Sequence, residues 1–317
     1  MLSVSYLTVA FATGIWRAVL DPWSEAIMQR ALAEVALLGI VGGTLGCWIV
    51  FYGLSYSAES LAHAMFPGLV MAVLLGFPLL VGAGVGVALA AVSIAIFGRA
   101  PEIGSDTSVA VVISALFGLG VMLAFSPESP PGLQHVLFGD ILGVSDLDLA
   151  LAAGLTVVML VALRLLHSQL LVVGFDRESA RSMGGKPKLA DVALLLIVAL
   201  ATVVAVQGLG NLLVVAVLVG PAATARLLAR RIVPMMALAA SLAVLAGVAA
   251  LYLSYYVGTA AGASVAGTMV VFYLAAFAAS SIRRGTRGGR AIRRRGRRAA
   301  PGAYRFFWDS SGRGEDA

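Results

Sequence analysis

The chain has 317 residues, of which 60% are hydrophobic and only 12% are charged, and its mean hydropathy is +0.98. A soluble globule of this size cannot bury so much apolar surface in one core, so lipid must cover the remainder. This composition excludes an ordinary soluble enzyme and predicts an integral membrane protein.

The net charge of +6 comes from one segment of the chain. Residues 283–317 hold eleven arginines and three acidic residues, which leaves the rest of the chain slightly acidic. The basic segment directly follows the last apolar run, and its basic core lacks interleaved aromatic residues. We expect residues 282–317 to form a disordered cytoplasmic tail beside anionic membrane lipid, and we expect no nucleic-acid binding.

At the other end of the chain, residues 1–33 are expected to form an N-terminal interfacial segment. Residues 1–20 are only moderately apolar, and they lack the basic start and the cleavage site of a signal peptide. Asp21 and Pro22 suit a helix start, and Trp23 suits the level of the lipid headgroups. The membrane domain should then occupy residues 34–281.

Apolar runs of about 20 residues, the length that crosses a bilayer core, recur through this domain. The chain is therefore predicted to be an all-α, polytopic transmembrane helical bundle of about eight or nine spans, counted by that length rule. Pro67 and Pro221 interrupt two of the runs, and we expect a helix break at each, where the helix lines protein or water. The expected spans are Glu34–Leu54, Leu61–Phe77, Leu79–Gly98, Thr107–Phe125, Leu147–Leu166, Leu189–Val206, Leu209–Leu228, Val233–Val257 and Gly262–Ser281.

The basic residues between these spans predict the orientation of the bundle. They lie at Arg99, within Arg177–Lys188, within Arg226–Arg231 and in the tail, so these segments should be cytoplasmic. The segment Ser126–Asp146 contains acidic residues but no arginine or lysine, and it should face outward. Its amphipathic part, Leu133–Leu142, should lie along the membrane surface.

An acidic residue and a histidine lie four residues apart within the stretch AESLAHAMFPG. Glu59 and His63 should therefore share one helix face, and ionisable groups at membrane depth point to function. A carboxylate and an imidazole suit a transition metal such as zinc or manganese, although two ligands do not close a site. A helix-capping Glu59 and a packing His63 would explain the same pattern.

A polar stretch, VVGFDRESARSMGGKPKLAD, separates two of the spans. Asp176 can cap a short helix from Arg177 to Met183, and the glycines that begin at Gly184 would end this helix. A short helix across the cytoplasmic face suits docking against a partner. An ordinary connecting loop would fit the same spacing.

Several motifs of catalysis and nucleotide binding are absent from the sequence. It contains no G-x-x-x-x-G-K-[ST], no G-x-S-x-G and no H-E-x-x-H, so we expect neither a P-loop nucleotide site nor an enzyme. The single cysteine, Cys47, excludes an internal disulfide and a cysteine-based metal cage.

Taken together, these stretches resemble the permeases of metal-type ABC importers, which handle zinc, manganese, iron or their chelates. The family's stretch G-D-A-x-S-H-A-x-x-P-G corresponds to Ala58–Gly68, with Glu59 where the family usually has aspartate. The further stretches that agree in order are SDTSVAVVIS, HVLFGDILGVS, FDRESARSMGG, QGLGNLLVVAVLVGPAATARLLA and LSYYVGTAAGA.

The resemblance implies a permease subunit of the plasma, or bacterial inner, membrane that works as a homodimer. Its partners would be a cytoplasmic ATPase dimer, which binds the ATP, and an extracytoplasmic metal-binding protein. The chain would bind no cofactor, and a divalent metal ion would be its cargo. Glu59 and His63 would contact the metal on its path, and Glu178, Ala180 and Gly184 would couple the permease to the ATPase.

Two alternatives remain open at this point. A permease for a siderophore, another metal chelate or cobalamin would share the broad architecture, but its path should lack ionisable side chains. A secondary transporter driven by an ion gradient should show repeated halves with charges inside the membrane. Neither alternative accounts for both the Glu59/His63 pair and the polar segment that begins at Asp176.

Overall fold

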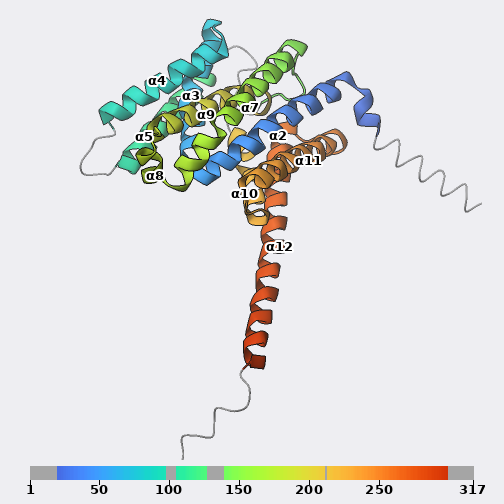
Figure 1. Cartoon of the computed structure of the whole chain (residues 1–317). Helices are drawn as coiled ribbons and strands as arrows, with labels where there is room; N and C mark the ends of the chain where they lie inside the picture. The colour runs from blue at the N-terminus through green and yellow to red at the C-terminus, as the bar shows by residue number, and fades with distance from the viewer. Residues whose placement is uncertain (1–19, 98–104, 127–138, 211–212, 299–317) are drawn as a thin grey trace, which may run out of the picture.

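The computed structural model describes residues 20–97, 105–126, 139–210 and 213–298, and these residues form a helical bundle (Figure 1). The elements are η1 (Asp21–Ser24), α2 (Ala26–Tyr52), α3 (Ser55–Leu75), α4 (Leu79–Phe97), α5 (Ser105–Ala124), α7 (Asp146–Phe175), α8 (Arg177–Ser182), α9 (Pro187–Leu209), α10 (Val214–Leu228), α11 (Ile232–Val257) and α12 (Ala261–Arg298). Within these residues, six helices are long and apolar enough to cross a membrane, and three shorter apolar helices accompany them. The predicted all-α polytopic bundle is therefore confirmed.

Helix α2 lies at the centre of the bundle and packs most extensively against α11 and α10. Helices α3, α4 and α5 form a second group, and α12 packs on α10 and α11 before it continues beyond them (Figure 1). Arg30 near the start of α2 meets Asp146 at the start of α7, and Tyr52 at the end of α2 meets Leu170. The two helices therefore run parallel, which defines an η1 end and an α8 end of the bundle.

Glycines allow the central helices to approach closely. A β-carbon at Gly43 of α2 would lie 2.5 Å from the backbone nitrogen of Ala240 in α11, and one at Gly46 would overlap the Leu218 carbonyl of α10. A β-carbon at Gly68 of α3 would likewise overlap the Gly82 carbonyl of α4. Without a strong hydrophobic drive between helices in lipid, such close backbone contacts supply much of the packing energy.

The helix breaks expected at Pro67 and Pro221 are not present, because α3 and α10 both continue through their prolines. Proline lacks an N–H, so the carbonyl four residues earlier loses its partner within the helix. In α10 this is the Val217 carbonyl, and a β-carbon on Gly42 of α2 would lie only 2.9 Å from it. The freed carbonyl therefore packs directly against a neighbouring glycine backbone, and the helix continues through Pro221.

Several helices extend past the apolar runs that predicted them. Helix α2 begins at Ala26 rather than Glu34, and α7 continues to Phe175 rather than Leu166. A transmembrane helix does not end where its apolar residues end, because polar side chains can extend it into the headgroup layer. Residues 1–19, 98–104, 127–138 and 299–317 lie outside the described part, as do the predictions that fall on them, and the division into three domains stays a prediction. The disorder expected from residue 282 is not present up to residue 298, because α12 continues to Arg298.

Large apolar side chains cover the outside of the bundle. Leu165 is 75% exposed, Met122 is 75% exposed and Ile96 is 64% exposed. A soluble protein does not expose so many large apolar side chains over its whole circumference. The surface is therefore suited to lipid.

Candidate functional site

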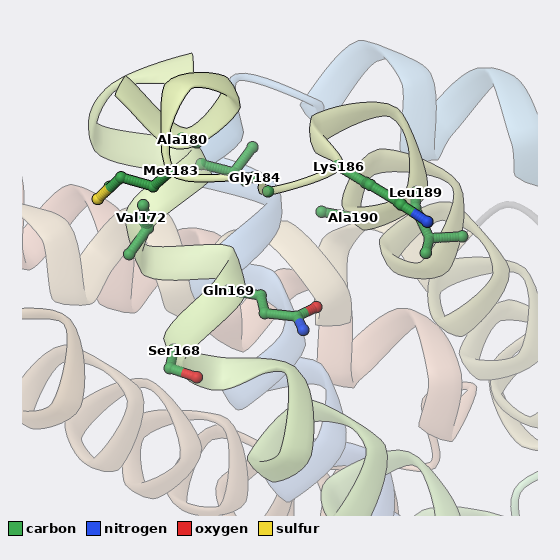
Figure 2. Close-up of a pocket in the computed structure, with 11 residues that line it drawn as sticks. Ser168, Gln169, Val172, Ala180, Met183, Gly184, Lys186, Leu189 and Ala190 are labelled. Carbon is green, nitrogen blue, oxygen red and sulfur yellow. The ribbon is translucent and has the colours of Figure 1, made fainter. Parts of the chain in front are cut away.

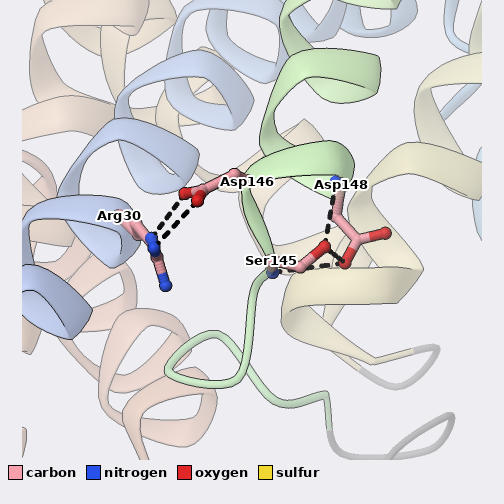
Figure 3. Close-up of polar contacts among 4 residues, drawn as sticks. All are labelled: Arg30, Ser145, Asp146 and Asp148. Atoms are coloured by element: carbon pink, nitrogen blue, oxygen red, sulfur yellow. Dashed lines mark hydrogen bonds and ion pairs between the residues drawn. The ribbon is translucent and has the colours of Figure 1, made fainter.

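The start of α7 is fixed against α2 at the η1 end (Figure 3). Arg30 pairs with Asp146 through two contacts, Nε to Oδ1 at 2.6 Å and Nη2 to Oδ2 at 2.9 Å. Ser145 and Asp148 form a reciprocal capping box, in which each side chain accepts a hydrogen bond from the other residue's backbone N–H. At this end of the bundle, Asp148 therefore caps α7, and Asp146 joins α7 to Arg30 of α2.

Glu59 and His63 lie in α3, closer to its beginning than to its end. Their side chains are on one face, as predicted, with Nε2 of His63 4.0 Å from Oε1 of Glu59. The Glu59 side chain is 54% exposed and the His63 side chain is 25% exposed. The carboxylate is therefore free to reorient, whereas the imidazole is largely fixed by packing.

The His63 ring is held from the side by α5. Its centroid lies 4.7 Å from that of Phe117, and its Nδ1 atom is buried without a hydrogen-bond partner among the described residues. Buried polar atoms are nearly always paired, so an unpaired imidazole nitrogen needs an explanation. In the described ranges no three histidine, cysteine, aspartate or glutamate side chains gather as a metal cluster, so one copy offers this site two ligands.

The short helix predicted after Asp176 is present as α8, Arg177–Ser182. The Asp176 carboxylate caps it by accepting hydrogen bonds from the backbone N–H groups of Glu178 and Ser179 and from the Ser179 hydroxyl. These bonds, led by the Ser179 hydroxyl, lower the pKa of Asp176. The cap therefore stabilises the fold above the ordinary carboxyl range and is lost as the pH falls through the lowered pKa.

The end of α8 is set by glycine. Gly184 has φ of +81°, which glycine adopts without strain and a β-branched residue does not. Glu178 and Gly184 are exposed, whereas Ala180 is 1% exposed and packs α8 onto the bundle. Of the three residues expected to couple to a partner, two therefore lie on the free surface and one faces inward.

A cavity of about 490 Å³ lies behind α8, between it and the α7 and α9 helices (Figure 2). Figure 2 shows Ala180 and Met183 on the α8 side of the cavity, with Gln169 of α7 and Leu189 of α9 on the other sides. Much of the surface between α8 and the bundle is consequently open. The short helix is attached through its first residues, through the buried Ala180 and through its glycine-containing exit.

Sequence reasoning missed the residues that attach the beginning of α8. Arg177 forms two parallel contacts with Asp191 of α9, Nη1 to Oδ2 at 2.9 Å and Nη2 to Oδ1 at 3.0 Å. The Cζ atom of Arg177 also lies 6.0 Å from the centre of the Tyr52 ring at the end of α2. Arg177 is 14 residues from Asp191 and 125 residues from Tyr52, and no spacing rule predicts contacts over such separations. The available signal was the pair of opposite charges, Arg177 and Asp191, on the two sides of a tight turn.

Comparison with known proteins adds independent findings. The sequence model of the ABC 3 transport family matches residues 24–280. The manganese import system permease protein ScaB of Streptococcus parasanguinis is 36% identical over 250 residues, which cover 79% of this chain and 89% of that protein. A probable iron transport system membrane protein of Haemophilus influenzae is 30% identical over 265 residues, covering 84% and 98% of the two chains.

The solved structure of PsaBC from Streptococcus pneumoniae in complex with Fab is also similar to the chain. The match has a TM-score of 0.77 and 33% sequence identity, and it covers 83% of this chain and 95% of the other. The helical arrangement is thus shared over nearly the whole of that chain.

Proposed function

Because the chain belongs to the ABC 3 transport family, we propose that it is the permease subunit of an ATP-driven importer for a divalent transition metal. Manganese and iron are the first candidates, since the similar proteins carry these metals in their names. The observation that carries the proposal is the Glu59/His63 pair on α3, where Nε2 of a largely buried imidazole lies 4.0 Å from the carboxylate of a half-exposed glutamate.

The spacing of the pair suits a transient metal contact. Metal–nitrogen and metal–oxygen bonds of about 2.1 Å at a tetrahedral angle place the two ligand atoms about 3.4 Å apart. Nε2 of His63 and Oε1 of Glu59 are 4.0 Å apart, so a small rotation of the exposed carboxylate would bring them to that distance. Two ligands bind weakly enough for release, and a second copy of the chain would supply the other two at a shared path.

The α8 end of the bundle is proposed to face the cytoplasm and to dock the ATPase. Arginine and lysine gather in the segments that begin at Arg177 and Arg226 and in the sequence after Ile282, whereas acidic residues prevail at the η1 end. An exposed Glu178 and the glycine exit at Gly184 give α8 a free outer surface. An extracytoplasmic metal-binding protein would then deliver the ion at the η1 end.

The test is uptake of radiolabelled manganese by the assembled complex at equal membrane abundance of each variant. His63→Ala should abolish uptake, because the imidazole is the fixed ligand of the pair. Glu59→Asp should retain uptake, because it keeps the charge, whereas Glu59→Gln should lose it with the negative charge. Normal uptake by both His63→Ala and Glu59→Gln would show that the pair is structural.

A further inference from the structure

We propose that Arg177 is a positioning residue that transmits movement of α8 to α9 and α2. The inference rests on the proposed function, since it needs an ATPase that moves α8. It goes beyond that function because it assigns the mechanical connection to one side chain, which neither touches the metal nor belongs to the expected docking residues.

The first connection is to α9. Arg177 and Asp191 meet in a fork-to-fork arrangement, with both N···O distances at or below 3.0 Å. The planar guanidinium fixes the direction as well as the distance of such a pair, which a lysine ammonium does not. A shift of the first residue of α8 therefore acts directly on the second turn of α9.

The second connection is to the joined ends of α2 and α7. Arg177 lies at the edge of cation–π range over the Tyr52 ring, and the Tyr52 hydroxyl donates a hydrogen bond of 2.8 Å to the Leu170 carbonyl. Phe51 and Phe175 add an edge-on ring contact with centroids 5.2 Å apart. The ends of α2 and α7 are thus tied together, and Arg177 links them to α9.

Beyond Arg177, α8 is attached to the bundle through the buried side chain of Ala180. The cavity of about 490 Å³ lies between the bundle and the side of α8 that carries Ala180 and Met183. The exit from α8 passes through Gly184 in the left-handed region, followed by a second glycine. Movement applied to α8 consequently reaches α9 and the end of α2 through the polar contacts of Arg177, in addition to the direct chain connection to α7 at Asp176.

Because Arg177 and Asp191 are partly exposed to solvent, their role in transmitting movement can be tested without unfolding the permease. The Arg177 side chain is 49% exposed and that of Asp191 is 27% exposed. Ion pairs with this much solvent contribute little to stability. Their geometry can still direct a movement, so substitutions should impair coupling without unfolding the permease.

The experiment measures manganese ions imported per ATP hydrolysed by the complete complex in proteoliposomes. Arg177→Lys and Asp191→Asn should each lower this ratio about fivefold or more, the low end of coupling between distant sites. Both should keep ATP hydrolysis and co-purification of the ATPase. Arg181→Lys, a change of the same type on the same helix, should keep the wild-type ratio, and the exchanged pair Arg177→Asp with Asp191→Arg should recover part of the loss.

Three results would overturn the inference. A wild-type ratio in Arg177→Lys would show that the fork geometry transmits nothing. Loss of the ATPase from Arg177→Lys, but not from Arg181→Lys, would place Arg177 in docking instead of transmission. Absence of ATP-driven uptake in the wild-type complex would remove the proposed function itself, and the inference with it. If Arg177→Lys melts below Arg181→Lys, the ratio in Asp191→Asn and in the exchanged pair decides the question.

Discussion

Glu34 is an acidic side chain in a buried position, where charged residues are rarely found without a partner. It lies in α2 with 2% exposure, and its Oε2 atom has no hydrogen-bond partner among the described residues. The neighbouring position in α9 is Gly208, where a β-carbon would lie 3.4 Å from the Glu34 carboxylate. The acid therefore packs directly against the α9 backbone, and a buried carboxylate oxygen without a hydrogen-bond partner is costly.

Glu34→Gln should therefore raise the stability of the purified permease. The amide keeps the size of the side chain but carries no charge, and burying an ionisable group without a partner costs more than burying a neutral amide. The measurement is the apparent melting midpoint in lipid nanodiscs, with Glu25→Gln as the control, because Glu25 is an exposed acid at the N-cap of the same helix and makes no capping hydrogen bond. A lower midpoint for Glu34→Gln alone would show that the carboxylate has a stabilising partner.

The candidate site could be predicted only where its residues are neighbours in the sequence. The Glu59/His63 pair follows from a four-residue spacing, and the Asp176 cap follows from the residue types around it. The contact of Arg177 with Asp191 and Tyr52 joins three helices, and the buried Glu34 of α2 lies beside Gly208 of α9. Such features are fixed by tertiary packing, which local spacing does not encode.

At the scale of elements, helix α8 begins at the Asp176 cap and is followed by Gly184 in the left-handed conformation. Glu178→Arg should reverse the charge on its free surface and weaken co-purification of the ATPase. Gly184→Val should have a similar effect, because a β-branched residue with φ near +81° costs about 1–3 kcal/mol in strain. The measurement is the amount of ATPase retained per permease after purification.

Gly154→Val is a matched control for the glycine substitution. Gly154 lies in α7 with open space around it, so valine should be tolerated there. Full ATPase retention in both Glu178→Arg and Gly184→Val would remove α8 as the docking element.

The helices themselves were predictable because long apolar runs must cross the membrane, whereas their ends were not. The end of α7 lies beyond Ser168 and Gln169, and α2 begins before Arg30, because polar side chains continue a helix into the headgroup layer. Pro67 and Pro221 were expected to break their helices, but both helices continue through them. The close approach of a glycine backbone to the Val217 carbonyl cannot be read from one helix alone.

At the scale of the whole molecule, the two ends of the bundle are chemically different. The η1 end has acidic residues that clamp α7 to α2, and the α8 end has basic residues and a short exposed helix. One protomer presents the proposed metal contacts, Glu59 and His63, on α3. The arrangement suits a dimer that receives a cation at one end and takes its driving force from a partner at the other.

The most direct measurement is manganese accumulation in proteoliposomes that contain the permease and its ATPase. ATP is enclosed in the lumen, and the binding protein and radiolabelled manganese are supplied outside. The account predicts accumulation that requires hydrolysable ATP and the binding protein and that is lost with His63→Ala. Accumulation driven by a proton or sodium gradient without ATP, or equal accumulation by His63→Ala, would contradict it.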